Sequence, residues 1–219
     1  MTFKLHTTDL SPFGQRAKLA MRVKGLLGDT EIIDTFGGTD ALGALAPMRQ
    51  IPILEHAGRP LPESQIIVEY LEDIHPTPSL LPDDPQDRAR ARLLARITDL
   101  YIAPHFLTLI VAMRTPEKIE TISEGWKKLG QGLSYSEKYL TDGGHYAVGD
   151  RLSIADIALA PFFFYVPLLS KWHELPALKD EPVRCKAYLN RVGQDPHIAM
   201  GFDEMGRAFE ARVKSLERV

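Results

Sequence analysis

The sequence predicts a two-part protein, with an α/β domain first and an all-α domain second. Strand-like and helix-like runs alternate over the first 75 residues, whereas the apolar residues beyond residue 86 follow only helical spacing. Between these regions "HPTPSLLPDDP" holds four prolines in eleven residues, which makes a stiff, extended connector. We therefore expect an α/β domain at residues 1–76, a linker at residues 77–86 and a helical domain at residues 87–219.

The first domain begins with two strand–helix pairs. Residues 3–8, "FKLHTT", alternate apolar and polar side chains as a half-buried strand does. Residues 11–25, "SPFGQRAKLAMRVKG", have the apolar spacing of a helix and end in a glycine. Residues 30–36, "TEIIDTF", form the second strand, and residues 40–47, "DALGALAP", form a short, weak helix ended by a proline.

A hairpin and a third helix complete this domain. The strands "IPILEH" and "RPLPE" flank the turn residues Ala57 and Gly58. The run "SQIIVEYLEDI" at residues 64–74 is a helix. Its apolar face is predicted to contain Ile66, Ile67, Tyr70, Leu71 and Ile74. The resulting order βαβαββα predicts a small mixed sheet with helices on its faces.

The second domain is predicted to consist of helices. They are expected at residues 87–113, 117–140, within 149–166, at 177–193 and at 195–216. Pro104 should kink the first of these helices. Ser153 and Asp156 have the spacing of a capping box, with Asp in place of Glu, and an uncharged apolar run follows them. We therefore interpret that helix as a buried folding element.

Composition excludes several classes of function. The formal net charge is −3, so there is no bulk electrostatic case for binding nucleic acid or an anionic membrane. The single cysteine, Cys185, excludes an intramolecular disulfide, a cysteine-based zinc site and a CxxC redox motif, and it favours a reducing cytoplasm. The seven histidines lack a metal-binding spacing, so we expect no metal. The N-terminus does not resemble a signal peptide.

Ser11 and Pro12 open the first helix. Serine is a favourable N-cap, and proline suits the first helical position because it has no N–H to lose. The pattern by itself favours a cap. However, this helix follows the first strand of an α/β unit, where ligands collect, and a helix N-terminus attracts anions. A cap and a ligand contact therefore both remain open for Ser11.

Two later stretches combine a loop with the start of a regular element. "QIPIL" places Pro52 at the start of a strand, where proline belongs at an edge or beside a ligand. Frequency alone favours a trans bond before Pro52, whereas a cis bond would turn the Ile51 main chain toward an extended peptide ligand. Glu63 and Ser64 stand where a loop becomes a helix; Ser64 can cap this helix, and its N-terminus can hold a carboxylate.

These stretches together resemble a cytosolic glutathione transferase of the serine type over nearly the whole chain. "SPFGQRAKLAMRVKG" is similar to the active-site stretch of the tau-like branch, and "APMRQIPIL" is closest in length to the zeta form. "PESQIIVEYLED" matches the family's Glu-Ser followed by a helix, and "LSIADIALAP" matches its capping box. The resemblance implies the glutathione transferase fold: a thioredoxin-like N-terminal domain and an all-α C-terminal domain. Ala46 and Gly14 depart from it, standing where the family has asparagine and serine or cysteine.

The resemblance also implies a role for the start of the first helix. Ser11 would donate a hydrogen bond to the sulfur of glutathione, the co-substrate, and Phe13 would line the sulfur site. The segment between Thr35 and Ala46 has no basic residue, so Arg49 is the nearest candidate to meet the glycine carboxylate of glutathione.

The remaining glutathione contacts are implied at the two later stretches. Gln50 and the backbone of Ile51 would bind the centre of the tripeptide beside a cis Pro52. Glu63 and Ser64 would hold its γ-glutamyl end.

A pocket for the second substrate is expected between the two domains, where small-molecule sites often lie. Tyr101, His105 and Leu109 recur every four residues and could share a face toward that pocket, and Tyr165 is a further candidate. Core packing is the favoured role of Leu109, and His105 can equally be a histidine with satisfied hydrogen bonds.

The leading functional hypothesis is conjugation of glutathione to a hydrophobic electrophile, a detoxification reaction, in a cytoplasmic homodimer. The second is a glutathione-dependent isomerase, of the maleylacetoacetate type, or a dehalogenase. The third is a non-catalytic relative that binds a regulatory or ribosomal partner, because fold does not imply function. Its best feature would be the Arg88, Arg92 and Arg96 face, for which a solvated surface or a subunit contact is favoured over a nucleic-acid patch.

Overall fold

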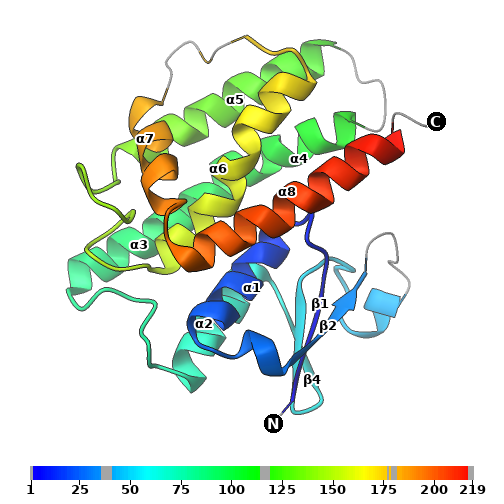
Figure 1. Ribbon diagram of the computed structural model, residues 1–219, viewed down its shortest axis with the longest axis vertical. Helices are drawn as coiled ribbons and strands as arrows, with labels where there is room; N and C mark the ends of the chain where they lie inside the picture. Colours follow the sequence, from blue (N-terminus) through cyan, green and yellow to red (C-terminus); the bar gives the residue numbers. More distant parts are fainter. Residues whose placement is uncertain (1, 36–40, 114–118, 177, 179–181, 217–219) are drawn as a thin grey trace. The chain divides into compact units, whose positions relative to one another are not determined.

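The computed structural model describes residues 2–35, 41–113, 119–176, 178 and 182–216 (Figure 1). The chain divides into two compact units. One contains Met1–Leu80 together with Pro196–Val219, and the other contains Leu81–Asp195. The first is called the N-terminal unit below, and the second is called the helical unit.

The N-terminal unit is built on a four-stranded mixed sheet in the order β2-β1-β3-β4. The strands are β1 (Phe3–Thr7), β2 (Thr30–Asp34), β3 (Ile53–His56) and β4 (Arg59–Pro62). β1 pairs parallel with β2 and antiparallel with β3, with Leu5 opposite both Ile32 and Leu54. Ala57 and Gly58, at φ 51° and 73°, form the hairpin turn between β3 and β4, as the sequence predicts.

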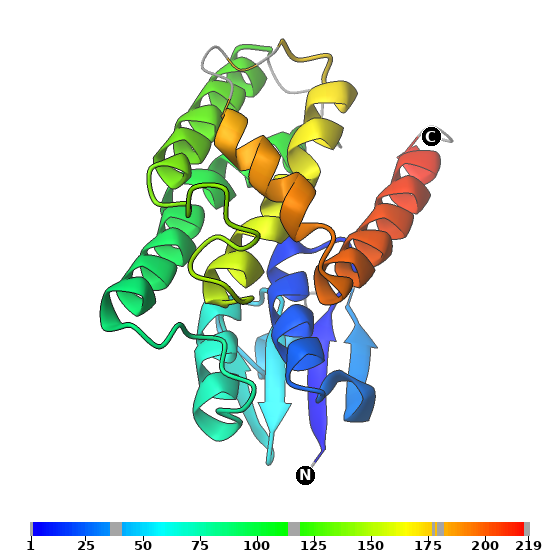
Figure 2. The ribbon, with the colours of Figure 1, turned by 60° about the vertical axis from the view of Figure 1, so that its left-hand side comes forward.

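Helices α1 (Pro12–Val23) and α2 (Ser64–Ile74) lie on one face of this sheet (Figure 2). The short segments η1 (Leu27–Asp29) and η2 (Ala41–Ala44) are 3-10 turns, so the expected short helix at residues 40–47 is shorter and tighter than predicted, and its residue 40 lies outside the described residues. The predicted apolar face of α2 is wrong at Ile66, which is 52% exposed. Val68 is buried beside Ile67 and Leu71, because the face that meets the sheet is rotated by part of a turn.

The last helix, α8 (Pro196–Leu216), belongs to the N-terminal unit, whereas the sequence analysis placed it in the helical domain. It packs along α1 through Glu204, whose carboxylate accepts hydrogen bonds from Lys18 at 2.7 Å, Arg22 at 2.7 Å and Gln15 at 3.2 Å. Burial acts to raise the pKa of Glu204, but Lys18 and Arg22 hold it below its ordinary value. The sequence does not indicate which residues the polar side chains of a buried helix contact. The packing of α8 against α1 could therefore not be predicted.

The chain leaves α2 through a segment held by a buried ion pair within the N-terminal unit. Lys24 donates to Glu72 at 2.7 Å and to the carbonyls of His75 and Pro78. Glu72 also accepts from Ser79 and from the Leu80 amide. These bonds fix the proline-rich connector at its first residues.

The helical unit contains α3 (Pro85–Ile97), a π-helical segment η3 (Thr98–Ile102), α4 (Ala103–Ala112), α5 (Ile119–Glu137), α6 (Ile154–Trp172) and α7 (Val183–Val192). The predicted kink at Pro104 takes the form of η3, which precedes the proline by two residues. The runs Pro85–Ala112 and Ile154–Trp172 are long and apolar enough to cross a membrane, but α6 is mostly buried by other helices, as a core helix is.

The N-terminus of α6 carries the capping box that the sequence predicts. Asp156 is fully buried and accepts four hydrogen bonds: from the Ala147 amide, the Ser153 amide and hydroxyl, and the Tyr188 hydroxyl. Burial raises the pKa of Asp156 to about 6, although these hydrogen bonds oppose the rise. The carboxyl therefore ties α6 to the loop before it and to α7, which is a role in folding.

Candidate functional site

The start of α1 presents a serine hydroxyl beside a helix N-terminus. Ser11 is the N-cap, and its Oγ accepts a hydrogen bond from the Gly14 amide at 3.1 Å. The Ser11 amide donates to the Thr8 carbonyl at 3.1 Å, which closes the turn after β1. A hydroxyl has one proton to donate besides its acceptor sites, and this bond uses an acceptor site. Ser11 is half-buried, so within the described residues the cap leaves its proton available for a ligand.

Gly14 is required by the close approach of α1 to β1. A Cβ at this position would lie 2.0 Å from Oγ1 of Thr7, a fully buried side chain. The serine or cysteine that the family has at this place would not fit here, because Thr7 fills the space. This contact explains one of the two departures from the family pattern.

The start of α2 has a strained backbone. Glu63 is the residue before the helix, with φ 72° and ψ 109°, a conformation that residues other than glycine rarely adopt. The expected cap at Ser64 is wrong: Ser64 is the first helical residue, and Glu63 holds the cap position without a side-chain cap hydrogen bond. The strained backbone at Glu63 therefore determines the direction in which the chain enters the first turn of α2.

A buried arginine joins the two helix N-termini. Arg16 of α1 is fully buried, and its Nη1 donates to the Ser64 hydroxyl at 3.4 Å. Its guanidinium carbon also lies 5.5 Å from the centre of the Phe13 ring. Arg16 thus positions Phe13 and Ser64, two predicted ligand contacts. Arg16 was not predicted as a site residue, because nothing near it in the sequence indicates a contact with Ser64.

The loop before β3 contains the cis bond that the resemblance implied. The Ile51–Pro52 peptide is cis, and sheet pairing begins only at Ile53. The Ile51 main chain therefore lies outside the ladder. Ile51 packs with Leu45 against a small cluster of Leu42, Ala46 and Ile53, which supports the loop from η2. The Gln50 side chain is exposed.

The four residues expected to face the second substrate do not share one exposed surface. Tyr101 is 46% exposed and packs edge-on against Tyr135 at 5.4 Å between ring centres. Leu109 and Tyr165 are fully buried, the latter against Phe106. Eight residues of α-helix turn about 80° beyond two full turns, so Tyr101 and Leu109 face different directions, and Tyr165 lies on another helix, α6.

His105 is half-buried, and its chemistry is that of a neutral side chain. Burial and the charge of Lys128 lower the pKa of His105, with Glu124 opposing them. The imidazole is therefore uncharged at neutral pH. In the described part of the chain, no group of three His, Cys, Asp or Glu side chains is placed to hold a metal ion.

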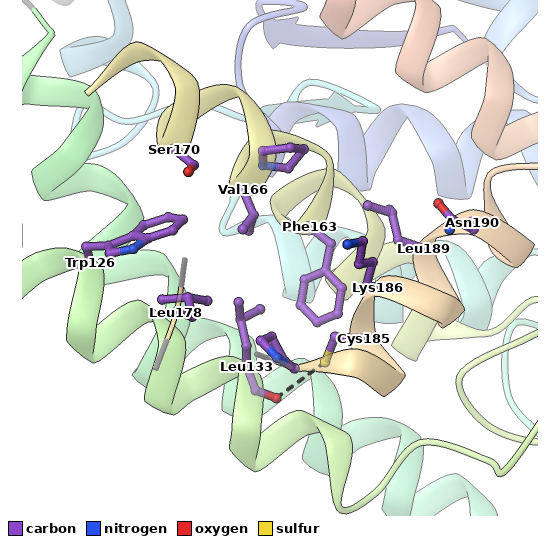
Figure 3. A pocket seen from close by; sticks show the side chains of 12 residues that line it. Trp126, Leu133, Phe163, Val166, Ser170, Leu178, Cys185, Lys186, Leu189 and Asn190 are labelled. Atoms are coloured by element: carbon purple, nitrogen blue, oxygen red, sulfur yellow. Dashed lines mark hydrogen bonds between the residues drawn. The ribbon is translucent and has the colours of Figure 1, made fainter. Parts of the chain in front are cut away.

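A separate cavity of about 530 Å³ lies within the helical unit, between α5, α6 and α7 (Figure 3). None of the residues expected to bind glutathione or the second substrate lines it. Its lining comes from Trp126, Leu133, Phe163, Val166, Pro167, Ser170, Leu178, Pro182, Cys185, Lys186, Leu189 and Asn190. The sequence analysis missed this cavity, because it is formed by faces of helices far apart in the chain.

Comparison with known proteins decides the family. Residues 5–79 match the glutathione S-transferase N-terminal domain, and residues 119–191 match the glutathione S-transferase C-terminal domain. The maleylacetoacetate isomerase of Rattus norvegicus is 34% identical over 154 residues, covering 67% of this chain and 69% of the relative. The chain belongs to the glutathione S-transferase family. The family resemblance and the fold class predicted from the sequence are confirmed.

A rice transferase, GSTU1, is similar to this chain in both sequence and structure. The probable glutathione S-transferase GSTU1 of Oryza sativa subsp. japonica is 36% identical over 171 residues, which cover 71% of each chain. The crystal structure of rice GST1 (OsGSTU1) in complex with glutathione superposes with a TM-score of 0.79 at 28% identity, covering 99% of this chain and 97% of that one.

Proposed function

We propose that this transferase-family protein binds glutathione, stabilises its thiolate and conjugates it to a small hydrophobic electrophile. The observation that carries the proposal is Ser11, which caps α1 through an acceptor site and keeps its proton for a ligand at the same helix N-terminus. The glutathione complex of the similar rice protein supports the choice of co-substrate.

The remaining glutathione contacts are assigned in the same proposal. Gln50 and the Ile51 main chain bind the centre of the tripeptide beside the cis Pro52. Glu63 and Ser64 hold the γ-glutamyl end at the N-terminus of α2, where amide groups favour a carboxylate.

The interactions at the start of α1 are strong enough to lower the pKa of the glutathione thiol by two units. A thiol with a pKa of ~8.5 is about 3% ionised at neutral pH, and lowering that pKa by two units requires roughly 2.7 kcal/mol. A helix N-terminus supplies about 0.3–1 kcal/mol, or up to ~2 when partly buried. A hydrogen bond to a charged group supplies about 1.5–3 kcal/mol. Ser11 and α1 together therefore account for the shift, and Phe13 lines the sulfur site.

Ionisation alone limits the gain in rate. Full ionisation raises the thiolate concentration at most about thirtyfold, so further acceleration comes from holding the electrophile near the sulfur. We assign contacts with the electrophile to Tyr101 and His105, which are exposed and half-buried, whereas Leu109 and Tyr165 are fully buried.

An isomerase activity is the second candidate. The identity of 34% with a maleylacetoacetate isomerase favours it, as does the zeta-like length of "APMRQIP". The two reactions share the glutathione site and differ in the second substrate.

The test combines binding and turnover. Retention on immobilised glutathione is expected, followed by conjugation with 1-chloro-2,4-dinitrobenzene and a panel of other halides, with maleylacetoacetate assayed in parallel. Turnover of maleylacetoacetate alone selects the isomerase. Absence of both retention and turnover overturns both enzymatic functions in favour of a non-catalytic, partner-binding relative.

We place the protein in the cytoplasm as a homodimer that acts in detoxification of reactive electrophiles. Exposed apolar side chains along α3, η3 and α4 support self-association; they are Leu93, Leu100, Leu107 and Val111. Sedimentation is expected to give a dimer at micromolar concentration, and a monomer there contradicts this assignment.

A further inference from the structure

We propose that Lys18 is a positioning residue for Ser11, because it ties the turn that presents the Ser11 hydroxyl to helix α8. Lys18 bridges two carboxylates, those of Asp9 in the turn and Glu204 in α8. All four residues belong to the N-terminal unit. This positioning role rests on the proposed function, since it assigns a further residue to the site where Ser11 meets the thiolate.

Ser11 stands at the end of a turn that follows β1. The Ser11 amide donates to the Thr8 carbonyl at 3.1 Å, and Asp9 and Leu10 are the central residues of this turn. Turns are among the parts of a fold that move most readily. A contact that fixes Asp9 therefore also limits the positions that the neighbouring Ser11 hydroxyl can take.

Lys18 supplies such a contact from within α1. Its Nζ donates to Oδ1 of Asp9 at 2.6 Å and to Oε2 of Glu204 at 2.7 Å. The Lys18 side chain is only 7% exposed, and short hydrogen bonds between charged groups are the strong ones. The ammonium group is thus held in one place and joins three segments: the turn after β1, helix α1 and helix α8.

The α8 end of the bridge is itself fixed. Glu204 also accepts from Arg22 at 2.7 Å and from the fully buried Gln15 at 3.2 Å. The two helices approach closely at Gly201, where a Cβ would lie 3.3 Å from Cδ2 of Leu19 and 3.4 Å from Oε1 of Gln15. Glu204 is therefore a rigid support for Lys18 and, through it, for the turn.

The charges of this cluster favour a geometric role over an electrostatic one. Among its described residues, the cations Lys18 and Arg22 meet the carboxylates of Asp9 and Glu204. Balanced charges produce a weak field at a distance, and seven residues separate Lys18 from Ser11, about 10 Å along a helix. The two roles also predict opposite signs. Removal of the Asp9 charge would lower the pKa of a nearby thiol through the field, whereas loosening the turn raises it.

The experiment measures the pKa of bound glutathione from thiolate absorbance in the full chain, in Asp9→Asn and in Lys18→Met. Both variants are expected to raise this pKa by about one unit, because a displaced hydroxyl loses part of its hydrogen bond to the thiolate. The kcat with 1-chloro-2,4-dinitrobenzene should fall roughly tenfold, with the Kd of glutathione little changed. Asp9 is half-buried, so Asp9→Asn tests the bridge even where Lys18→Met folds poorly. An unchanged or lowered thiol pKa in Asp9→Asn overturns the proposal.

Arg22→Met is the matched control. The side chains of Arg22 and Lys18 are both 7% exposed and both bind Glu204, but Arg22 lies one turn further from Ser11. Its loss should lower the free energy of unfolding and leave the thiol pKa at the wild-type value. Equal rises of the thiol pKa in Arg22→Met and Lys18→Met would show a general loosening of α1, and the specific bridge would be wrong.

A Ser11→Ala background separates this positioning role from the proposed function. In that background, adding Asp9→Asn should leave the thiol pKa unchanged, because the turn acts through the hydroxyl that is now absent. A further rise on adding Asp9→Asn overturns the positioning of Ser11. A wild-type thiol pKa in Ser11→Ala itself contradicts the proposed function and the positioning role together. A raised pKa in Ser11→Ala with no effect of Asp9→Asn in the wild-type chain contradicts the positioning role alone.

Discussion

The N-terminal and helical units present two different kinds of surface. The glutathione site proposed in the N-terminal unit is made from chain ends and turns: the capped start of α1, the strained start of α2 and the cis bond at Pro52. The cavity of the helical unit is made from the sides of three helices. The first surface presents main-chain amides and hydroxyls, and the second presents apolar side chains with a polar rim.

The buried charges of the two units differ in the same way. In the N-terminal unit, Glu204 and Glu72 meet lysine or arginine partners, and the pKa of each is lowered. In the helical unit, Asp156 meets only neutral donors, and burial raises its pKa. In the N-terminal unit, ion pairs therefore join α1 to α8 and to α2, whereas hydrogen bonds from neutral donors organise the core of the helical unit.

The largest effect on stability is expected from Asp156→Ala. Four donors lose their buried acceptor, at roughly 1 kcal/mol or more each, so the free energy of unfolding should fall by about 4 kcal/mol. Urea denaturation followed by circular dichroism measures the change. Asp150 is exposed, so Asp150→Ala is the matched control. Equal decreases in the free energy of unfolding of the two variants would show that Asp156 does not organise the helical unit.

The next effect is an opposite pH dependence in the two units. Because the pKa of Glu204 is lowered in the folded state, this residue contributes fully to the free energy of unfolding above its unfolded pKa. The contribution is lost as the pH falls through the folded value. Because the pKa of Asp156 is raised to about 6 in the folded state, this residue contributes fully to the free energy of unfolding below its unfolded pKa of ~3.9. The contribution is lost as the pH rises through 6. The Asp156 contribution changes by up to about 3 kcal/mol over this window.

Unfolding free energies from pH 2 to pH 8 for the wild type, Glu204→Gln and Asp156→Asn test these signs. The difference between wild type and Glu204→Gln should shrink toward low pH. The difference between wild type and Asp156→Asn should shrink toward high pH. Parallel slopes for the two differences would contradict the contrast between the units.

A smaller effect is expected from Gly14→Ala. The added Cβ meets the buried Thr7 Oγ1, and such overpacking costs about 2 kcal/mol. Thr7→Ala in the same chain removes the clash and should recover more than half of the loss. Gly28→Ala, whose Cβ would meet nothing within 4 Å, is the matched control and should leave the unfolding midpoint unchanged. Failure of Thr7→Ala to rescue would show that Thr7 is not what requires the glycine.

The sequence predicted well those elements that local signals determine. Residues close together in the sequence determine each of three features: the Ser-Pro start of α1, the Ala57–Gly58 turn and the capping box of α6. The π-helical form of η3 was not predicted, although Pro104, which has no N–H for the helical ladder, predicted a kink there. Tyr101 is exposed whereas Leu109 is buried, so spacing by four residues did not predict a shared face for them.

Long-range polar contacts were equally invisible. Nothing near Arg16 in the sequence indicates that it reaches Ser64, 48 residues away. Nothing near Glu204 indicates that α8 joins α1. The cavity likewise depends on three helix faces, and each face alone has the pattern of ordinary core packing.

The central claim is that the proton of Ser11 points at sulfur while its oxygen caps α1. Absorbance of the thiolate, recorded while the glutathione complex is titrated, measures the pKa of the bound thiol directly. In the wild type it should lie about two units below the free value of ~8.5. Ser11→Asp keeps a capping acceptor but loses the donor and adds a negative charge, so the pKa should return to at least ~8.5. An unchanged low pKa in Ser11→Asp, with glutathione still bound, would show that Ser11 is only a cap.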